Sequence, residues 1–279
     1  LANVKADRRL FHVGGGDVSF AVGGAYHHDY YLNQAFENAS TPSLSQVNLF
    51  GNADSSRDVW SAFAEMNVPF IGEANAISGV NRLELNAAVR YDHYSDAGNT
   101  TNPKIGLRYD PIDGVSFHGS WGTSFRAPTL SDSNPASTAT IFSLPNFGPF
   151  GNVIEYVGGN ANLKPETATT WSVGVQVDPH GSNFHASLNY FNIDYRGLID
   201  TAPVFSPQAF TDPGYAPFVI FNPTVAQVNA IYSLPWAPPP IIAAADVDII
   251  VDARRNNIGK IKMDGLDFNV SYAIPAGGG

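Results

Sequence analysis

The chain has 279 residues, a formal net charge of −10 and no cysteine, so a disulfide framework, a thiol nucleophile and a zinc knuckle are excluded. The acidic balance, without a cluster of Lys and Arg, argues against nucleic-acid binding, because phosphate contacts need a basic surface. No uninterrupted apolar run reaches the ~18 residues of a membrane helix, so a chain that spans a membrane would do so with strands.

Eight stretches, taken in chain order, alternate apolar and polar residues with a period of two, which is the pattern of a strand with two different faces. They cover residues 17–31, 58–70, 83–94, 102–111, 115–125, 167–178, 183–199 and 258–274. Residues 1–13 are interpreted as the tail of one more strand. The first residues lack a signal-peptide core and the last are glycines directly after a strand-like run, so we expect an internal piece of a longer chain.

The apolar phase of these stretches carries no charged residue through the middle of any strand. An Arg or Lys facing lipid at the midplane would cost about 2 to 4 kcal/mol, so this partition is typical of a lipid-facing surface. The strands also reach about ten residues or more, which matches a tilted bilayer crossing better than a soluble sheet. We therefore expect the apolar phase to face lipid and the polar phase to face the lumen of a barrel. The expected lumen-facing residues are Glu65, Glu84, Arg90, Arg108 and Gln176.

The connections between the stretches alternate in length. Short turns with glycine or proline follow residues 13, 70, 110, 178 and 274, and longer loops follow residues 31, 94, 125 and 199. Short turns on one rim and long loops on the other are typical of outer-membrane barrels. In the 183–199 stretch the apolar phase slips at Phe191, which indicates either a bulge or the point where the strand leaves the lipid. Residues 224–234, in the last long loop, predict a short helix.

Several runs resemble TonB-dependent outer-membrane receptors. WGTSFRAPTLSD (Trp121–Asp132) resembles their G-x-SFRAP-x-L segment, and GGNANLKPETATTWSVGV (Gly158–Val175) resembles their N-x-x-L-x-PE-x-(S/T) segment before a barrel strand. MNVPF, FHASLNYFNIDYRGLI and DGLDFNVSY resemble further strands, in matching order across nearly the whole chain. The motif residues of this chain are Arg126, Pro128, Pro165 and Glu166.

The resemblance implies a plugged barrel of about 22 strands in the bacterial outer membrane, which takes up a scarce ligand with energy from TonB. The implied ligand is a ferric siderophore, cobalamin or a saccharide, and the implied partners are membrane lipid, the receptor's own plug and TonB. Residues 1–279 would form one partial domain, an all-β, antiparallel up-and-down transmembrane barrel segment with about eight strands. The plug, the TonB box and the closing strand are not visible in this sequence. The resemblance implies no enzymatic activity, cofactor or metal.

The three long loops, residues 32–57, 126–166 and 200–257, are expected to gather ligand at the cell surface. Their aromatic residues are the expected ligand contacts, namely Phe147, Phe150, Tyr156, Tyr215, Phe218 and Trp236. Arg126 and Glu166 stand at neighbouring strand ends, where opposite charges can pair across the barrel wall. We expect this pair to fix the base of the loop rather than to touch ligand.

Other interpretations stay open at this point. A complete small eight-stranded barrel with a structural or adhesive role would pair its first and last strands. An outer-membrane lipase or protease would need a nucleophile beside a base, and the sequence has no G-x-S-x-G elbow. His27 and His28 are adjacent, so they point to opposite faces of a strand and cannot hold one metal together. Asp246, Asp248 and Asp252 lack the glycine and terminal glutamate of a calcium loop.

Overall fold

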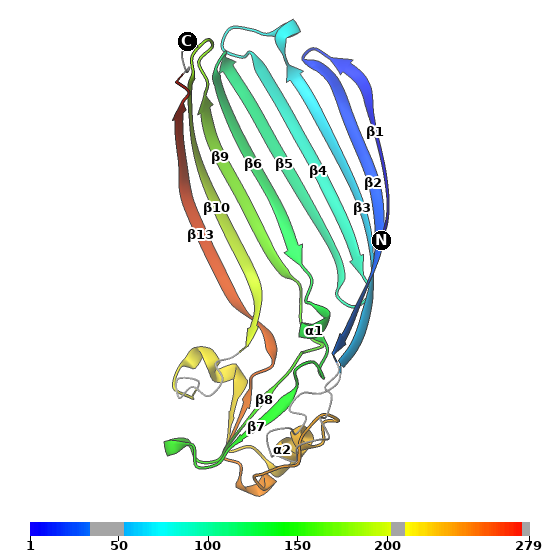
Figure 1. The fold of residues 1–279 in the computed structure, drawn as a ribbon, viewed down its shortest axis with the longest axis vertical. Helices are drawn as coiled ribbons and strands as arrows, with labels where there is room; N and C mark the ends of the chain where they lie inside the picture. Colours follow the sequence, from blue (N-terminus) through cyan, green and yellow to red (C-terminus); the bar gives the residue numbers. More distant parts are fainter. Residues whose placement is uncertain (34–52, 202–209, 275–279) are drawn as a thin grey trace, which may run out of the picture.

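The structure is a computed structural model, and it describes residues 1–33, 53–201 and 210–274. Within these residues, nine strands form one antiparallel sheet, here called the wall sheet, in the order β1-β2-β3-β4-β5-β6-β9-β10-β13. The sheet is long and curved (Figure 1). The strands are β1 (Ala2–Val13), β2 (Gly16–Asn33), β3 (Ala53–Ile71), β4 (Arg82–Tyr94), β5 (Gly98–Ile112), β6 (Val115–Arg126), β9 (Glu166–Val177), β10 (Phe184–Thr201) and β13 (Arg255–Tyr272). The all-β, antiparallel architecture expected from the sequence is confirmed.

The described part of the wall sheet holds nine strands, namely the eight expected stretches and β1. Residues 1–13, which were interpreted as the tail of one more strand, pair with β2 as β1. β1 and β13 lie at opposite edges of the sheet (Figure 1). The first and last strands of the described chain therefore do not pair as a complete eight-stranded barrel would require.

The strand register places the apolar phases of neighbouring strands on one face. Leu85 lies opposite both Val68 and Leu107, and Val173 lies opposite Gly119 and Tyr190. This apolar face is uncovered, since Leu107 is 47% exposed and Phe268 is 73% exposed. A continuous apolar face of this size marks a surface that meets another apolar medium. The structure does not pack these side chains against a second layer, as a soluble sandwich would.

The apolar face has a definite limit along β10. The register between β10 and β9 runs without a shift from Ala186 to Arg196, so the slip at Phe191 is not a bulge. Up to Tyr190 the side chains on this face are apolar or aromatic, and beyond it they are Asn192, Asp194 and Arg196. The sequence pattern therefore records the point at which the strand leaves the apolar zone. We call this zone the apolar band, and it includes Leu83–Tyr91, Val115–Trp121, Trp171–Val177, Ala186–Tyr190 and Leu266–Tyr272.

The connections collect at two rims. The turns β1–β2, β5–β6 and β9–β10 and the segment with the 3-10 helix η1 (Glu73–Asn75) lie at one end, here the turn rim (Figure 1). The connection after Tyr94 is not the longer loop that the sequence predicted, because β5 begins at Gly98, whose φ of +79° permits a tight turn. Pro103 lies where β5 pairs with β4 alone, a position that tolerates proline.

The long connections 127–165 and 202–254 build a second layer at the opposite end, here the loop rim (Figure 1). Their described residues form a four-stranded loop sheet in the order β11-β12-β8-β7. Its elements are β7 (Thr140–Leu144), β8 (Val153–Val157), β11 (Val219–Phe221) and β12 (Ile249–Asp252), with the helices α1 (Leu130–Ser133), η2 (Gly148–Phe150), η4 (Pro213–Phe218), α2 (Val225–Tyr232) and η5 (Ala244–Asp246). The helix expected at 224–234 is confirmed as α2, which Thr224 caps by accepting from the Gln227 N–H. Among the described residues, no helix is long and apolar enough to cross a membrane.

Candidate functional site at the loop rim

Glu166 is the centre of a buried polar cluster where three wall strands meet the long loops. Its carboxylate has no exposed surface, and it lies opposite Arg126 in the β6–β9 register. The Arg126 guanidinium donates two hydrogen bonds to it, one of 2.8 Å from Nη2. The Tyr195 hydroxyl and the Ile199 N–H also donate to it, the latter at 2.6 Å. Because Arg126 and Glu166 frame one long loop and Ile199 precedes the next, the cluster fastens both loop bases.

Arg57 forms a second buried link, which the sequence did not predict. It ends the segment that was interpreted as a polar loop, although β3 already begins at Ala53. Its guanidinium donates to the Pro128 carbonyl at 2.6 Å and pairs with Asp96 at 2.8 Å. The charge also lies 5.6 Å from the centre of the Tyr94 ring. Arg57 therefore joins β3, the β4–β5 turn and the segment after β6. In the sequence, this role is indicated only by the position of Arg57 as an isolated arginine just before an alternating stretch.

A hollow of about 490 Å³ opens between these two links. It is lined by the side chains of His27, Asp29, Tyr31, Arg57, Tyr94 and Arg126 and by the loop residues 127–131. Both cationic and aromatic groups therefore meet at the base of the loop rim. Pro128, one of the motif residues, forms part of the hollow, while Pro165 directly precedes β9 beside Glu166. Both guanidinium groups have carboxylate partners, Arg57 with Asp96 and Arg126 with Glu166, so the hollow presents aromatic rings beside paired charges.

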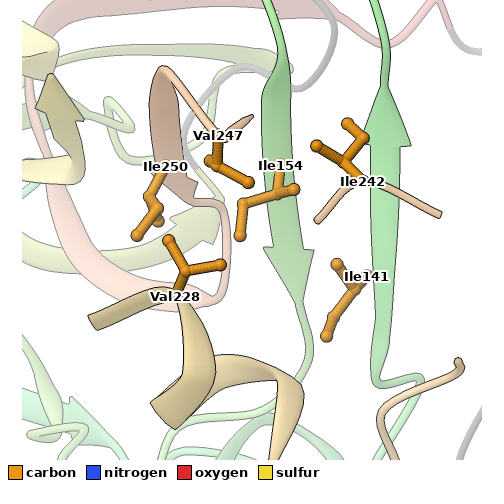
Figure 2. Packing of buried hydrophobic residues seen from close by; sticks show 6 residues of the cluster. All are labelled: Ile141, Ile154, Val228, Ile242, Val247 and Ile250. Atoms are coloured by element: carbon orange, nitrogen blue, oxygen red, sulfur yellow. The ribbon is translucent and has the colours of Figure 1, made fainter. Parts of the chain in front are cut away.

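The two long loops share a hydrophobic core on one side of the loop sheet. β8 of the first loop pairs in parallel with β12 of the second, from Ile249 opposite Val153 to Asp252 opposite Tyr156. On one side of the loop sheet, Ile154 packs among residues of the second loop, including Val228 of α2 and Ile250 (Figure 2). The residues drawn in Figure 2 are Ile141, Ile154, Val228, Ile242, Val247 and Ile250. The two loops therefore form one folded unit rather than two independent irregular loops.

The other side of the loop sheet carries a second core. Val153 packs there with Val219 and Val251 of the second loop. Phe147 and Phe150 cover this core together with Phe210, and the rings of Phe150 and Phe210 are 4.5 Å apart. Asp248 adds a polar link, because its carboxylate accepts a 2.8 Å hydrogen bond from the Asn152 N–H. Each face of the sheet therefore binds the first loop to the second.

The six aromatic residues expected to contact ligand have different surroundings. Phe147 and Phe150 pack against the second core, and Tyr156 and Trp236 pack against the first. The Arg254 guanidinium lies 4.9 Å from the centre of the Tyr156 ring. Tyr215 and Phe218 belong to η4 and are half-buried. All six lie in the loop-rim layer, and four of them also build the loop cores, which is a role that the sequence did not predict.

The five residues expected to face the lumen lie on the face opposite the apolar one. In the register, Glu84 lies opposite Arg108, Glu65 opposite Ala88, and Gln176 opposite Ser116. Their charges are paired locally: Arg90 Nε donates to Asp92 at 2.9 Å and Arg108 Nε to Asp110 at 3.1 Å. Glu84, Arg108 and Gln176 also line a hollow of about 740 Å³ near the turn rim.

The histidines at the loop rim have separate partners. His28 Nδ1 lies 2.9 Å from Asp58 and His27 Nε2 lies 3.6 Å from Asp29, on opposite faces of β2. In the part of the chain that the structure describes, no three His, Cys, Asp or Glu side chains are placed to hold a metal ion.

The pH dependence of stability at the loop rim follows from Glu166, which lies beyond Trp171 and outside the apolar band. Burial raises the pKa of this carboxyl, but hydrogen bonds from Arg126, Ile199 and Tyr195 have a larger opposite effect. The pKa therefore falls from 4.5 to about 2. When the pKa of a carboxyl is lower in the folded state than in the unfolded state, the ionised carboxylate stabilises the fold at any pH above the unfolded-state pKa. This contribution is lost as the pH falls towards the folded-state pKa. The free-energy difference between wild type and Glu166→Gln should therefore shrink as the pH falls from 4.5 towards 2. Urea unfolding across this range measures it, and a constant difference would contradict the proposed charge state.

The shared core of the loops gives a second prediction. Ile154→Ala removes buried apolar contacts worth about 2 to 5 kcal/mol, so it should destabilise both loops although the change lies in the first. Hydrogen exchange should therefore accelerate in residues 225–252 as well as in 140–157. Ile241→Ala is the matched control, because Ile241 is 79% exposed, and it should leave exchange unchanged. Acceleration confined to the first loop would show that the loops are independent.

An antiparallel wall with one continuous apolar face, short turns at one rim and a folded loop layer at the other defines the class of β-barrel membrane proteins. The chain belongs to the TonB-dependent receptor-like β-barrel family, whose family model matches residues 2–278.

Individual relatives agree with this family. Over 60% of the present chain, the sequence is 24% identical to the ferrienterobactin receptor of Escherichia coli. Over 51% of the present chain, it is 25% identical to the heme/hemopexin utilization protein C of Haemophilus influenzae. Among solved structures, it resembles a mutant ferric enterobactin receptor of Pseudomonas aeruginosa in complex with enterobactin, with a TM-score of 0.64 and 20% identity over 99% of the chain. The siderophore receptor PirA of Acinetobacter baumannii gives a TM-score of 0.62 with 16% identity over 98%.

The chain covers only part of these proteins. It spans 22% of the Escherichia coli receptor and 20% of the Haemophilus influenzae protein. It spans 33% and 34% of the two solved structures. These named relatives are receptors and utilization proteins.

Proposed function

We propose that this chain is part of the wall and surface-loop layer of an outer-membrane receptor that takes up a ferric siderophore in a TonB-dependent way. Cobalamin and a saccharide are alternative ligand classes, and heme is a further one because of the similarity to a heme/hemopexin utilization protein. The observation that carries the proposal is the match to the receptor family along residues 2–278, together with a wall sheet that has one apolar and one polar face. Lipid, a plug domain and TonB are the proposed partners.

The ligand class is supported by the relatives, since the chain is similar to a receptor named for ferrienterobactin. The hollow at the loop rim adds the aromatic rings of Tyr31 and Tyr94, on which the flat rings of a catechol-bearing chelator can stack. Arg57 and Arg126 are paired with Asp96 and Glu166, so they hold the lining in place rather than supply free charge to a ligand. The loop aromatics, above all Tyr215 and Phe218 of η4, are the proposed first contacts for the incoming ligand.

Uptake of labelled ligands by cells tests the proposal. A strain that lacks the receptor should lose saturable uptake of a labelled ferric siderophore and regain it when the full-length gene is restored. A TonB-deficient strain should bind the ligand at its surface without importing it. Uptake that is independent of TonB would overturn the proposal. Receptor-dependent uptake of labelled cobalamin or saccharide alone would replace the ligand class but keep the mechanism.

The structural or adhesive alternative has less support. It needs a closed small barrel, whereas β1 and β13 are the two edges of the described wall sheet. An enzymatic function would need a nucleophile beside a base, whereas Glu166, a buried acidic group at the loop rim, is held by four donated hydrogen bonds.

A further inference from the structure

The pairing between β5 and β6 stops well before either strand ends. The last pair on the loop side is Lys104 opposite Gly122. Beyond it, residues 98–103 of β5 pair only with β4, and residues 123–126 of β6 pair only with β9. The other neighbouring pairs of the described wall continue to within one residue of the loop-side end of a strand. β5 and β6 diverge towards the loop rim, and we call their two unpaired edges, 98–103 and 123–126, the seam (Figure 1).

Side chains rather than backbone hydrogen bonds hold the seam together. Just beyond the last pair, the Thr123 hydroxyl donates a 3.4 Å hydrogen bond to Asn102 Oδ1. Nearer the loop rim, the rings of Tyr94 and Phe125 meet edge to face with their centres 5.4 Å apart. Pro103 has no N–H to donate to β6. Because side-chain rotamers exchange much faster than a strand ladder opens, the seam can part without loss of the sheet.

The seam begins at the height where hydrocarbon ends. Unpaired backbone groups cannot face hydrocarbon, so an unpaired edge in a membrane wall has to lie in a more polar layer. Trp121 and Trp171 lie opposite each other just below the seam and are 41% and 38% exposed. Tryptophans on the outer face of a barrel collect at the membrane interface. Thr123 lies two residues beyond Trp121, which is about 5 Å higher at about 3.3 Å per residue and a tilt of about 45°. The seam therefore faces the headgroups, next to the ends of the acyl chains.

A hollow of about 400 Å³ lies on the polar side of the seam. Asn102, Thr123, Ser124 and Phe125 of the seam all line it. Phe125 also lines the loop-rim hollow, as does its ring partner Tyr94. The two hollows therefore meet at the same pair of aromatic rings that closes the seam. A molecule held in the seam would have access to the loop-rim hollow from the side.

The hollow behind the seam offers one free positive charge. Arg90 is neutralised by Asp92, to which its Nε donates at 2.9 Å. Glu65 also lines the hollow but lies two strands from β5, since Glu65 is opposite Ala88 and Ala88 is opposite Lys104. Lys104 is exposed directly beside the seam and, among the described residues, forms no ion pair. The seam thus combines a cation on its inner side with acyl chains on its outer side, which suits a molecule with an anionic head and an apolar tail.

We propose that the seam is a lateral binding site for an acylated, negatively charged ferric chelate. The anionic head lies in the hollow beside Lys104, and the acyl chain passes between Pro103 and Phe125 into the outer leaflet. A ligand that partitions into the membrane would then reach the loop-rim hollow without crossing the loop layer. This inference rests on the proposed function, since it requires a bilayer around the wall sheet and a ferric chelate as the ligand.

Binding to the full-length receptor in phospholipid vesicles tests the inference. The probes are two complexes of radioactive ferric iron with a citrate-hydroxamate chelator, one with a dodecanoyl chain and one without. Asn102→Cys/Thr123→Cys places a disulfide across the seam, in a chain that has no cysteine of its own. Oxidation should raise the Kd of the acylated complex about tenfold, because the acyl chain loses its path to the leaflet, and reduction should restore it. The Kd of the complex without the chain should stay constant.

A second disulfide is the matched control for the first. Ser120 and Ser172 lie opposite each other in the β6–β9 ladder, with their hydroxyl oxygens 2.9 Å apart on the polar face. Ser120→Cys/Ser172→Cys therefore joins two strands that are already paired. Oxidation of this variant should change the Kd of neither complex.

Lys104→Gln tests the charge without a disulfide. The loss of one charge-assisted contact should raise the Kd of the acylated complex about fivefold and leave the other complex unaffected. Lys5→Gln is the control, because Lys5 is exposed on the polar face of β1, at the edge of the sheet. It should leave both Kd values unchanged.

The outcomes separate this inference from the proposed function. Failure of the acylated complex to bind, a Kd that ignores oxidation of the seam, or an equal response of the two complexes would overturn the inference. An equal loss in Lys5→Gln would also overturn it. Heat-modifiable migration confirms folding of each variant, and Lys104→Gln keeps the test decisive if the cysteine pair misfolds. TonB-dependent uptake of ferric siderophore is measured in cells with the same variants, so a seam without any role leaves the proposed function intact.

Discussion

Leu85→Arg should reduce assembly of the full-length receptor in the outer membrane at least several-fold. Leu85 lies inside the apolar band of β4, between Val68 and Leu107 on the apolar face. An arginine there would have to face hydrocarbon, at a cost of about 2 to 4 kcal/mol near the midplane. A cost of this size changes a folding equilibrium by at least about 30-fold. The measurement is the yield of heat-modifiable receptor in purified outer membranes.

The neighbouring residue provides the control for this substitution. Glu84 lies on the polar face, where it pairs with Arg82 at 2.7 Å, and the two side chains are 21% and 45% exposed. Glu84→Gln should therefore give nearly wild-type yield, because partly exposed ion pairs contribute less than about 1 kcal/mol. Equal yields for Leu85→Arg and Glu84→Gln would mean that the facing of β4 is wrong.

Glu166→Ala should destabilise the receptor by about 3 kcal/mol and loosen the bases of both long loops. The substitution leaves the Ile199 N–H and the Tyr195 hydroxyl without their acceptor, and it removes the partner of Arg126. Half of the Arg126 side chain is exposed, so water can solvate its charge and limit the loss. Urea unfolding at neutral pH measures the free energy, and hydrogen exchange at residues 196–201 reports the loop base.

Glu84 provides the control for Glu166→Ala, because its substitution shows how much stability is lost when a carboxylate outside the cluster is removed. Glu84→Ala removes a partly exposed ion pair and should cost less than about 1 kcal/mol. If both alanine variants lose similar stability, or if exchange near Ile199 stays slow in Glu166→Ala, then the cluster around Glu166 does not fasten the loops.

The wall sheet could be predicted from sequence because its pattern is periodic. Leu83 to Tyr91 alternates except at Ala88, and β4 has the expected extent, from Arg82 to Tyr94. The first residues of β5 could not be predicted, because GNTT has the composition of a turn. Only the pairing with β4 turns this polar segment into a strand, and that pairing is a tertiary contact.

The loop layer was largely hidden from sequence analysis. VIEYV and IIVD are short apolar runs without alternation, so they do not distinguish a buried strand from a loop. They become strands because segments distant in the sequence pair with each other. At the candidate site, the motif positions predicted the Arg126–Glu166 pair, whereas the Ile199 N–H is brought to Glu166 next to a register shift in β10. Arg57 was missed because its neighbours, NADSSRD, have the composition of a loop.

The parallel pairing of β8 with β12 has a consequence for synthetic fragments of the chain. Val153 and Ile249 are neighbours in space, and both side chains are buried. A peptide copied from either segment alone would leave its apolar side chains uncovered, so it should not keep the conformation that it has in the loop sheet. An immunogen for this layer therefore has to present both segments together.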